Sequence, residues 1–388
     1  MTKRRIYLDH TATTPLDQRV LEAMLPYFSS TFGNASSIHS FGREAKGALE
    51  GARAAIAAAI GASPGELFFV SGGTEADNMA LIGAWEAGRK NGREHVVVNA
   101  AEHHAVLDTA KALADRGASV TLVPVDSRGR VHPRDIAGVV SDRTAIVSVM
   151  HANNEVGTIN PVREIAEAAH TVGAVVHTDA VQSLGKIPVN VQDLGVDLLS
   201  LSAHKLYGPK GIGALYVKRG TNLDSIMHGG GQERGRRPGT ENVPLAVGFA
   251  RAVELALGDR EAEFRRLQAL RDALQSTLME RFPFLVVNGD PENRLAHILN
   301  ISVDSTKAGL EGEMLVPTLD LEGIAVTSGS ACTSGSMQPS HVLMAMGRDE
   351  ATAKATVRFS FGRGNTRDDV VETVERFAAV LERIVRSN

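Results

Sequence analysis

The sequence contains very little cysteine: one residue, Cys332, among 388. A single thiol excludes an intramolecular disulfide and leaves a metal site without a set of thiolates, so we expect a reducing, cytoplasmic setting and no bound metal. The chain also lacks an excess of basic charge, because 41 Lys and Arg residues stand against 45 Asp and Glu. The resulting net charge of −4 gives no indication of nucleic acid as a partner.

Long apolar runs are missing as well. We find no charge-free apolar stretch long enough to span a membrane and expect no membrane partner. The opening MTKRRIYLDH carries basic side chains but only Ile6, Tyr7 and Leu8 in an apolar row, far short of the core of a secretory signal. Aromatic residues make up only 4%, which decides nothing about function. Hydrophobic residues at 43% are enough for a large core and more than one domain.

What the sequence does contain is a regular alternation of strand and helix patterns. Short runs rich in β-branched residues occupy residues 67–70, 95–99, 119–125, 144–150, 174–179, 196–202 and 212–217. Amphipathic stretches of helical length lie between several of them, at 74–90, 103–116 and 161–171. This order predicts an α/β fold with a mostly parallel sheet and helices on both faces. The last run follows a short Gly/Pro turn, so we expect it to join the sheet antiparallel.

The pattern changes near residue 258. A long charged and apolar helix is predicted over 259–282, and strand patterns follow at 297–303 and 356–361. A second amphipathic helix is predicted over 367–385. We therefore expect a large domain over residues 16–260 and a smaller α/β domain over 261–388.

Polar residues follow the predicted strands, at the edge where open parallel sheets bind ligands. The first run leads into SGGTEADN, where a Gly-Gly turn meets Thr74 as the expected N-cap of a helix, a pattern that can bind an anion through backbone N–H groups. Taken alone, an ordinary strand-to-helix turn is the simpler interpretation. The residues that end or follow the later runs are His103, Asn154, Asp179, Gln182, Ser202, His204 and Lys205.

An anion site, an acid and a lysine at one sheet edge suit pyridoxal 5′-phosphate (PLP). This cofactor needs a lysine amine for a Schiff base, a carboxylate beside its ring nitrogen and donors for its phosphate. Lys205 and Asp179 are 26 positions apart and end adjacent predicted strands. A P-loop NTPase is a poor alternative because no GxxxxGK[ST] occurs, and the first βα turn lacks the dinucleotide GxGxxG pattern.

Eight motifs occur in the same order as in one known family of enzymes. They are YLDHTATTPLD, FGNASSIHSFG, SGGTEADN, HANNEVGT, HTDAVQSLGK, SAHKLYGPKGIGALYV, GGGQERGRRPGTENV and SGSACTSGSMQPSHVLMAMG. Over nearly its whole length the chain resembles the PLP-dependent cysteine desulfurases of the subgroup with a long cysteine-bearing loop. The nitrogenase-associated and general iron–sulfur-cluster branches are the most similar. The resemblance implies PLP fold type I, which is aspartate aminotransferase-like, with a seven-stranded sheet in the large domain. It also implies a homodimer and a small domain that includes residues 1–15.

The same resemblance implies a role for individual residues. Lys205 would form the Schiff base, and His103 would stack on the ring and act as an acid–base group. Cys332 would be the nucleophile, carried by a mobile loop at about 326–340. The cofactor-binding set would be Thr74, His103, Asn154, Asp179, Gln182, Ser202, His204 and Lys205, with Thr240 contributed by the partner subunit. Arg358, assisted by Asn34, would bind the substrate carboxylate.

The implied reaction turns L-cysteine into L-alanine and passes the sulfur, as a persulfide on Cys332, to an acceptor or iron–sulfur scaffold protein. Two alternatives use the same scaffold, an aminotransferase-like enzyme and a selenocysteine-specific lyase. A catalytically silent scaffold subunit is a third, but it predicts loss of Lys205 or Asp179, and both are present. The sequence leaves open which acceptor is served, and whether that acceptor belongs to a nitrogenase system or to general cluster assembly.

Overall fold

The computed structural model of the chain describes residues 4–308, 312–329 and 338–386. Its main sheet has seven strands in the order β2-β8-β7-β6-β5-β3-β4. They are β2 (Leu67–Val70), β3 (His95–Asn99), β4 (Ser119–Val123), β5 (Thr144–Ser148), β6 (Val175–Asp179), β7 (Leu198–Ser202) and β8 (Gly213–Val217).

The directions of these strands confirm the predicted mostly parallel sheet. The neighbouring pairs from β4 to β7 are all parallel, whereas β8 is antiparallel to both β7 and β2. The short turn before β8 produces this reversal, as predicted, because a parallel strand would need a long crossover connection. The predicted runs 119–125 and 144–150 end earlier, at Val123 and Ser148, because their partner β3 ends at Asn99.

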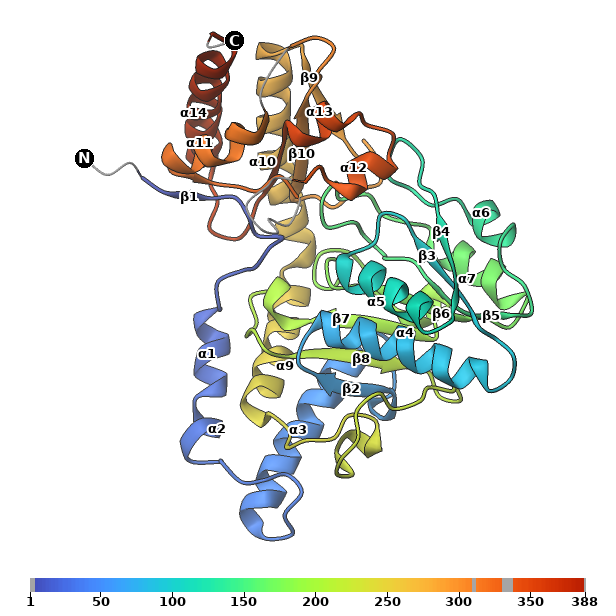
Figure 1. Cartoon of the computed structure of the whole chain (residues 1–388). Coiled ribbons are helices and arrows are strands. Elements are labelled where there is room, and N and C mark those ends of the chain that lie inside the picture. Colours follow the sequence, from blue (N-terminus) through green and yellow to red (C-terminus); the bar gives the residue numbers. More distant parts are fainter. Residues whose placement is uncertain (1–3, 309–311, 330–337, 387–388) are drawn as a thin grey trace.

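Helices cover both faces of the sheet (Figure 1). One face carries α3 (Ser40–Ala59), α7 (Val162–His170) and α9 (Val243–Gly258), and the other carries α4 (Gly73–Arg89) and α5 (His104–Asp115). Successive side chains of a strand point to opposite faces of the sheet, and in β2 both faces are apolar. Phe69 packs in the core on the side of α3, α7 and α9, whereas Phe68 and Val70 pack in the core on the side of α4 and α5. The remaining helices before residue 260 are the short α1 (Gln18–Met24), α2 (Pro26–Ser29), α6 (Pro133–Ala137) and α8 (Val191–Leu194).

A second, smaller α/β unit is built from the C-terminal part of the chain. Its antiparallel sheet has the order β12-β10-β9, and β1 pairs parallel with β11. The strands are β1 (Ile6–Tyr7), β9 (Leu285–Asn288), β10 (Ile298–Val303), β11 (Ile324–Ala325) and β12 (Thr356–Ser360). The helices are α10 (Arg260–Arg281), α11 (Leu315–Leu321), α12 (His341–Ala345), α13 (Glu350–Lys354) and α14 (Arg367–Arg386). The two long helices predicted in this region are therefore confirmed as α10 and α14.

The apolar side chains of this smaller unit form a core of their own. Ile6 and Leu8 from the N-terminal segment pack in it together with Leu274, Phe359 and Phe377. This supports the division into a large domain over 16–260 and a small domain over 261–388 with 1–15, which we retain as a proposal.

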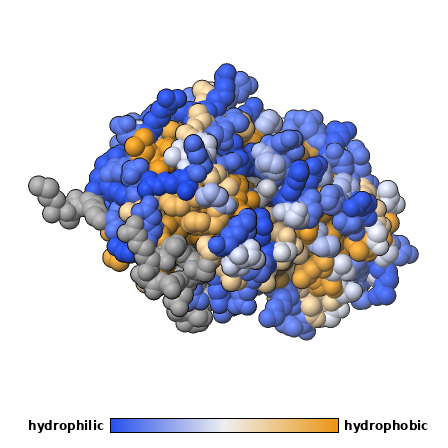
Figure 2. Space-filling view, turned by 90° about the horizontal axis from the view of Figure 1, so that it is seen from above, coloured by the Kyte–Doolittle hydropathy of each residue, from blue (hydrophilic) through white to orange (hydrophobic). Residues whose placement is uncertain are grey.

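The end of the molecule formed by the smaller unit is seen from above in Figure 2, where hydrophilic residues surround several hydrophobic patches. Among the described residues, the helices are too short or too polar for any of them to cross a membrane.

Candidate active site

A cavity of about 400 Å³ opens at the carboxyl ends of β6 and β7. It is lined by nine of the residues predicted from the sequence, namely Thr74, His103, Asn154, Asp179, Gln182, Ser202, His204, Lys205 and Arg358. These nine residues come from six motifs or strand ends, spread over almost 300 positions, and they share one pocket. Their grouping is a structural observation, whereas their individual roles remain predictions.

Lys205 lies in the 3₁₀ turn Ala203–Lys205 that follows β7. Its Nζ donates hydrogen bonds to the carbonyls of Thr11 and Ala12, at 2.7 Å each. Burial lowers the pKa of Lys205 to about 8, and the positive charge of Arg358 acts in the same direction. An amine with this pKa is partly neutral near pH 7, as a nucleophile or a proton acceptor must be.

Asp179 and His103 form the acidic and aromatic sides of the pocket. Asp179 ends β6 beside β7, as predicted, and accepts a hydrogen bond from the N–H of Val181 at 2.8 Å. Burial raises the pKa of Asp179, while His103 and Lys205 act in the opposite direction. Burial also lowers the pKa of His103, which favours its neutral ring.

The hydrogen bonding of His103 indicates which nitrogen carries the proton. His103 is the N-cap of α5, and its Nδ1 accepts a hydrogen bond from the N–H of Ala105 at 3.1 Å. A neutral imidazole has one donor and one acceptor nitrogen, so this contact assigns the proton to Nε2. In this arrangement, His103 presents a donor at Nε2.

The N-terminus of α4 forms another side of the pocket. The predicted N-cap at Thr74 is wrong, because Gly72 occupies the N-cap position and the helix begins at Gly73. A Cβ on Gly73 would lie 2.9 Å from Val181 Cγ2, so a glycine is needed for the helix to approach this closely. The N-cap thus lies two residues earlier than predicted, and Thr74 lies in the first turn, where it still lines the pocket. Unpaired N–H groups at this helix end are suited to a phosphate.

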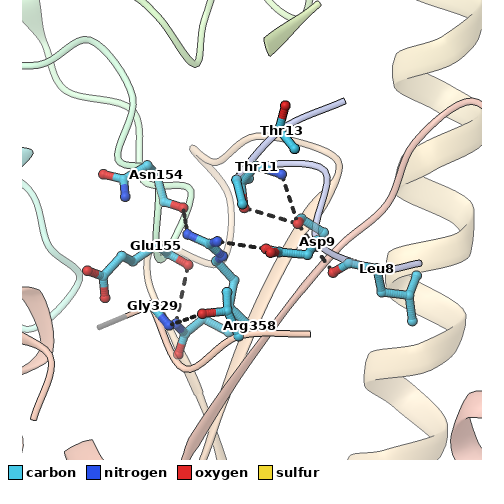
Figure 3. Close-up of polar contacts among 12 residues, drawn as sticks. Leu8, Asp9, Thr11, Thr13, Asn154, Glu155, Gly329 and Arg358 are labelled. Atoms are coloured by element: carbon cyan, nitrogen blue, oxygen red, sulfur yellow. Dashed lines mark hydrogen bonds and ion pairs between the residues drawn. The ribbon is translucent and has the colours of Figure 1, made fainter. Parts of the chain in front are cut away.

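Arg358 reaches the pocket from β12 of the smaller unit (Figure 3). Its Nη2 pairs with Asp9 Oδ1 at 2.9 Å, and its Nη1 donates to the Asn154 carbonyl at 2.8 Å. Its Nε is buried and has no hydrogen-bond partner among the described residues. A bound carboxylate could accept from Nε and compete with Asp9 for Nη2, a two-pronged contact for which the guanidinium is shaped.

Two predicted site residues, Asn34 and Thr240, do not line this pocket in the described part of the chain. Asn34 is exposed, and its Oδ1 accepts from the N–H of Ser36 at 2.8 Å in a local turn. Thr240 is exposed and lines a separate groove with Arg237. Cys332 lies outside the described residues, as do most of the positions of its expected loop.

Further residues that line the pocket or contact its side chains were not predicted from the sequence. The carbonyls of Thr11 and Ala12 hold Lys205, and Asp9 pairs with Arg358, although all three lie in the quoted motif YLDHTATTPLD. Asp77, in the motif SGGTEADN, is buried and lines the floor. A backbone carbonyl leaves no signal in residue types, so only the motif around Thr11 and Ala12 could have pointed to them.

These groups fit PLP. The cavity volume is within the range of about 300–1,000 Å³ that small-molecule sites occupy. One side offers the amine of Lys205, another the buried carboxylate of Asp179, and a third the start of α4 with Thr74. The unpaired Nε of Arg358 remains for an anionic substrate group.

Comparison with known proteins also indicates an enzyme that uses PLP. The model of the family described as "Aminotransferase class-V", whose members depend on PLP, matches residues 6–372. The chain is 46% identical to "Cysteine desulfurase IscS" of Dictyoglomus turgidum over 383 residues, which cover 99% of this chain and 95% of that protein. It is 47% identical to a "Cysteine desulfurase" of Gluconacetobacter diazotrophicus over 381 residues, or 98% and 94% of the two chains.

A solved structure described as "NIFS-LIKE PROTEIN" superposes with a TM-score of 0.90 at 38% identity, covering 98% of this chain and 100% of the other. The predicted PLP fold type I and cofactor are thereby confirmed. On the extent of these matches, the chain belongs to the class-V aminotransferase family of PLP-dependent enzymes.

Proposed function

We propose that this chain is a cysteine desulfurase that converts L-cysteine into L-alanine and retains the sulfur as a persulfide on Cys332. The observation that carries the proposal is the meeting of Lys205, Asp179 and Arg358 in one pocket. Its support is the identity of 44–47% to relatives named cysteine desulfurase over nearly the whole chain.

The residues of the pocket divide by the part of PLP that they suit. Lys205 would hold the aldehyde carbon and Asp179 the ring nitrogen. The ring hydroxyl would be approached by Gln182 and Asn154, and the phosphate would be held by Thr74, Ser202 and His204. PLP, when bound, supplies a carbonyl for the substrate amine and a protonated ring that withdraws electron density from the substrate Cα.

The chain's own groups then move protons and hold the substrate. Lys205 Nζ takes the proton from the substrate Cα, and its pKa of about 8 lets it both accept and return a proton near neutral pH. Arg358 binds the substrate carboxylate through Nε and Nη2. His103 donates from Nε2. If His103 is to accept the Cys332 proton at Nε2, its own proton must first move to Nδ1, with loss of the Ala105 hydrogen bond at a cost of about 1 kcal/mol.

The sulfur transfer step uses Cys332 as a thiolate. Its Sγ attacks the substrate sulfur, the Cβ–S bond breaks, and Cβ takes up a proton to become the methyl group of alanine. No second cysteine exists in the chain to receive the sulfur by an internal disulfide. The persulfide therefore has to react with another molecule, which we propose to be a sulfur acceptor or an iron–sulfur scaffold protein.

We also propose that the enzyme is a homodimer in a reducing, cytoplasmic compartment. Large apolar side chains of the segment after α1 are exposed, among them Phe28, Phe32, Phe41 and Ile38, the last at 91%. Single exposed apolar residues are ordinary, but four in 14 positions indicate a covered surface. A second copy would cover them and would also account for Thr240, which is exposed and does not line its own chain's pocket.

The proposal is tested with the purified chain, PLP, L-cysteine and a thiol reductant. Alanine and sulfide are expected in equal amounts, measured by amino-acid chromatography and sulfide assay, because the reductant releases the persulfide sulfur after each turnover. D-cysteine is the control substrate and is expected to give neither product. Pyruvate in place of alanine, or activity restricted to selenocysteine, would show a different lyase on this scaffold.

The role of Arg358 has its own test. Arg358→Ala is expected to raise the KM for L-cysteine about a hundredfold, because two charge-assisted hydrogen bonds to the carboxylate are lost. Arg358→Lys keeps the positive charge but cannot form two parallel hydrogen bonds to the carboxylate, so an intermediate KM is expected. Steady-state alanine formation measures both variants. An unchanged KM in the alanine variant would assign carboxylate binding to another residue.

A further inference from the structure

A second lysine, Lys186, lies close to the pocket and takes no part in the reaction described so far. It lies in the turn that follows Asp179 at the end of β6 and contains Gln182, within the motif HTDAVQSLGK. Gly185 has a φ of 75° and packs its Cα side against Ala256 of α9, so the turn approaches the helix closely just before Lys186. Burial, together with the charge of Lys205, lowers the pKa of Lys186 to about 7.

The hydrogen bonds of Lys186 lead to Lys205. Lys186 Nζ donates to Gln182 Oε1 at 3.0 Å, and Gln182 Nε2 donates to the Thr11 carbonyl at 3.1 Å. The same carbonyl accepts the hydrogen bond of Lys205 Nζ at 2.7 Å. An amide has a donor end and an acceptor end, so a donor held at Oε1 fixes which end of Gln182 faces Thr11.

Lys186 borders a small cavity behind the pocket, where its amine has few other polar groups to bind. The cavity has a volume of about 50 Å³, and both Lys186 and Lys205 line it. His10 Nδ1 and His297 Nε2 are buried at or near it without a hydrogen-bond partner among the described residues. No carboxylate within salt-bridge distance of Lys186 is found in the described part of the chain. An amine placed here without an ion pair costs stability, which argues for a role beyond packing.

We propose that Lys186 is a positioning residue for the cofactor lysine. By holding Oε1 of Gln182, it orients the amide that fixes the Thr11 carbonyl, and this carbonyl in turn holds the Lys205 amine where it meets the cofactor. The inference rests on the proposed role of Lys205 in binding PLP. Lys186 itself touches neither the substrate nor the reacting atoms.

The test uses Lys186→Met, which keeps a straight side chain of similar length but has no donor. Cofactor-free protein is mixed with PLP and reduced with borohydride at intervals, and peptide mass spectrometry measures the fraction of Lys205 that carries the reduced cofactor. Capture is expected to be roughly tenfold slower than in the unsubstituted chain, the effect of losing about one hydrogen bond. The ratio of visible circular dichroism to absorbance of the bound cofactor is expected to fall, because the cofactor is held less rigidly.

Two further variants separate positioning from packing. Lys111→Met replaces an exposed lysine of α5 and is expected to capture PLP within about twofold of the unsubstituted rate. Lys186→Arg retains a donor and is expected to recover most of the rate and of the dichroism ratio. Lys186→Gln replaces the methionine variant if that protein does not fold, since its amide is too short to reach Gln182 Oε1.

The outcomes are distinguishable. A folded Lys186→Met protein with an unchanged capture rate and dichroism ratio overturns the proposal, and so does an arginine variant as impaired as the methionine variant. Attachment of PLP to a lysine other than Lys205 in the unsubstituted chain contradicts the proposed function itself, whatever Lys186 does.

Discussion

Replacing Lys205 by alanine is expected to abolish the visible absorption of the bound cofactor and to lower alanine formation by about 10⁴-fold or more. Lys205 is the amine that faces the pocket beside Asp179, with its Nζ held by two backbone carbonyls. In the proposed mechanism, the substitution removes both the attachment point of the cofactor and the group that takes the Cα proton. Absorption spectra of the protein after incubation with PLP and gel filtration, followed by the alanine assay, measure the two losses.

The control for this variant is Lys218→Ala. Lys218 follows β8 at the opposite edge of the sheet, where its Nζ pairs with Asp197 at 3.2 Å. Absorption and activity close to those of the unsubstituted chain are expected there, because a partly exposed ion pair contributes little. If Lys205→Ala keeps its absorption band, another lysine binds the cofactor, and borohydride reduction would identify it.

Replacing Cys332 by alanine is expected to stop alanine release while leaving the cofactor band intact. The expectation rests on the sequence, since Cys332 is the only thiol and lies within the motif SGSACTSGSMQPSHVLMAMG. Turnover is expected to fall at least about a hundredfold, because no other nucleophile in the chain can take the substrate sulfur. Mass spectrometry of the unsubstituted protein after L-cysteine, without reductant, is expected to show one extra sulfur atom on the Cys332 peptide.

Cys332→Ser provides the matched control, because a hydroxyl of similar size retains the shape of the side chain but is a far weaker nucleophile for sulfur. It is expected to behave like the alanine variant. Full alanine release by either protein would mean that the sulfur leaves without Cys332, and the enzyme would then be a PLP lyase of another kind.

Much of the fold was predictable because most strands of the main sheet are buried on both faces. Runs such as Thr144–Ser148 are buried throughout, and the spacing of these runs predicted the mostly parallel sheet. The strand ends then placed Asp179 and Lys205 side by side. The N-cap of α4 was predicted two residues late, because a glycine N-cap has no side chain to mark it whereas Thr74 looks like a better cap.

Other parts of the site had no signal of their own in the sequence. Thr11 and Ala12 act through backbone carbonyls, and any residue type carries the same carbonyl. Arg358 was assigned by resemblance alone, and its neighbours Asp9 and Asn154 are more than 200 positions away along the chain. Contacts between such distant segments depend on the packing of the two units and are not encoded in any local pattern.

The pairing of the N-terminal segment with the last strands has a consequence for synthesis on the ribosome. β1 pairs with β11, the N–H of His10 donates to the Ser360 carbonyl, and Thr11 bonds the Ser360 hydroxyl. Residues 6–11 are therefore held in place by residues that are made more than 300 positions later. The large sheet can form while the chain is still growing. The carbonyls of Thr11 and Ala12, which bind the Lys205 amine, are fixed in place only after residue 360 has left the exit tunnel. Cofactor capture is thereby tied to synthesis at least as far as residue 360, and a product that stops before it would have the sheet without a working pocket.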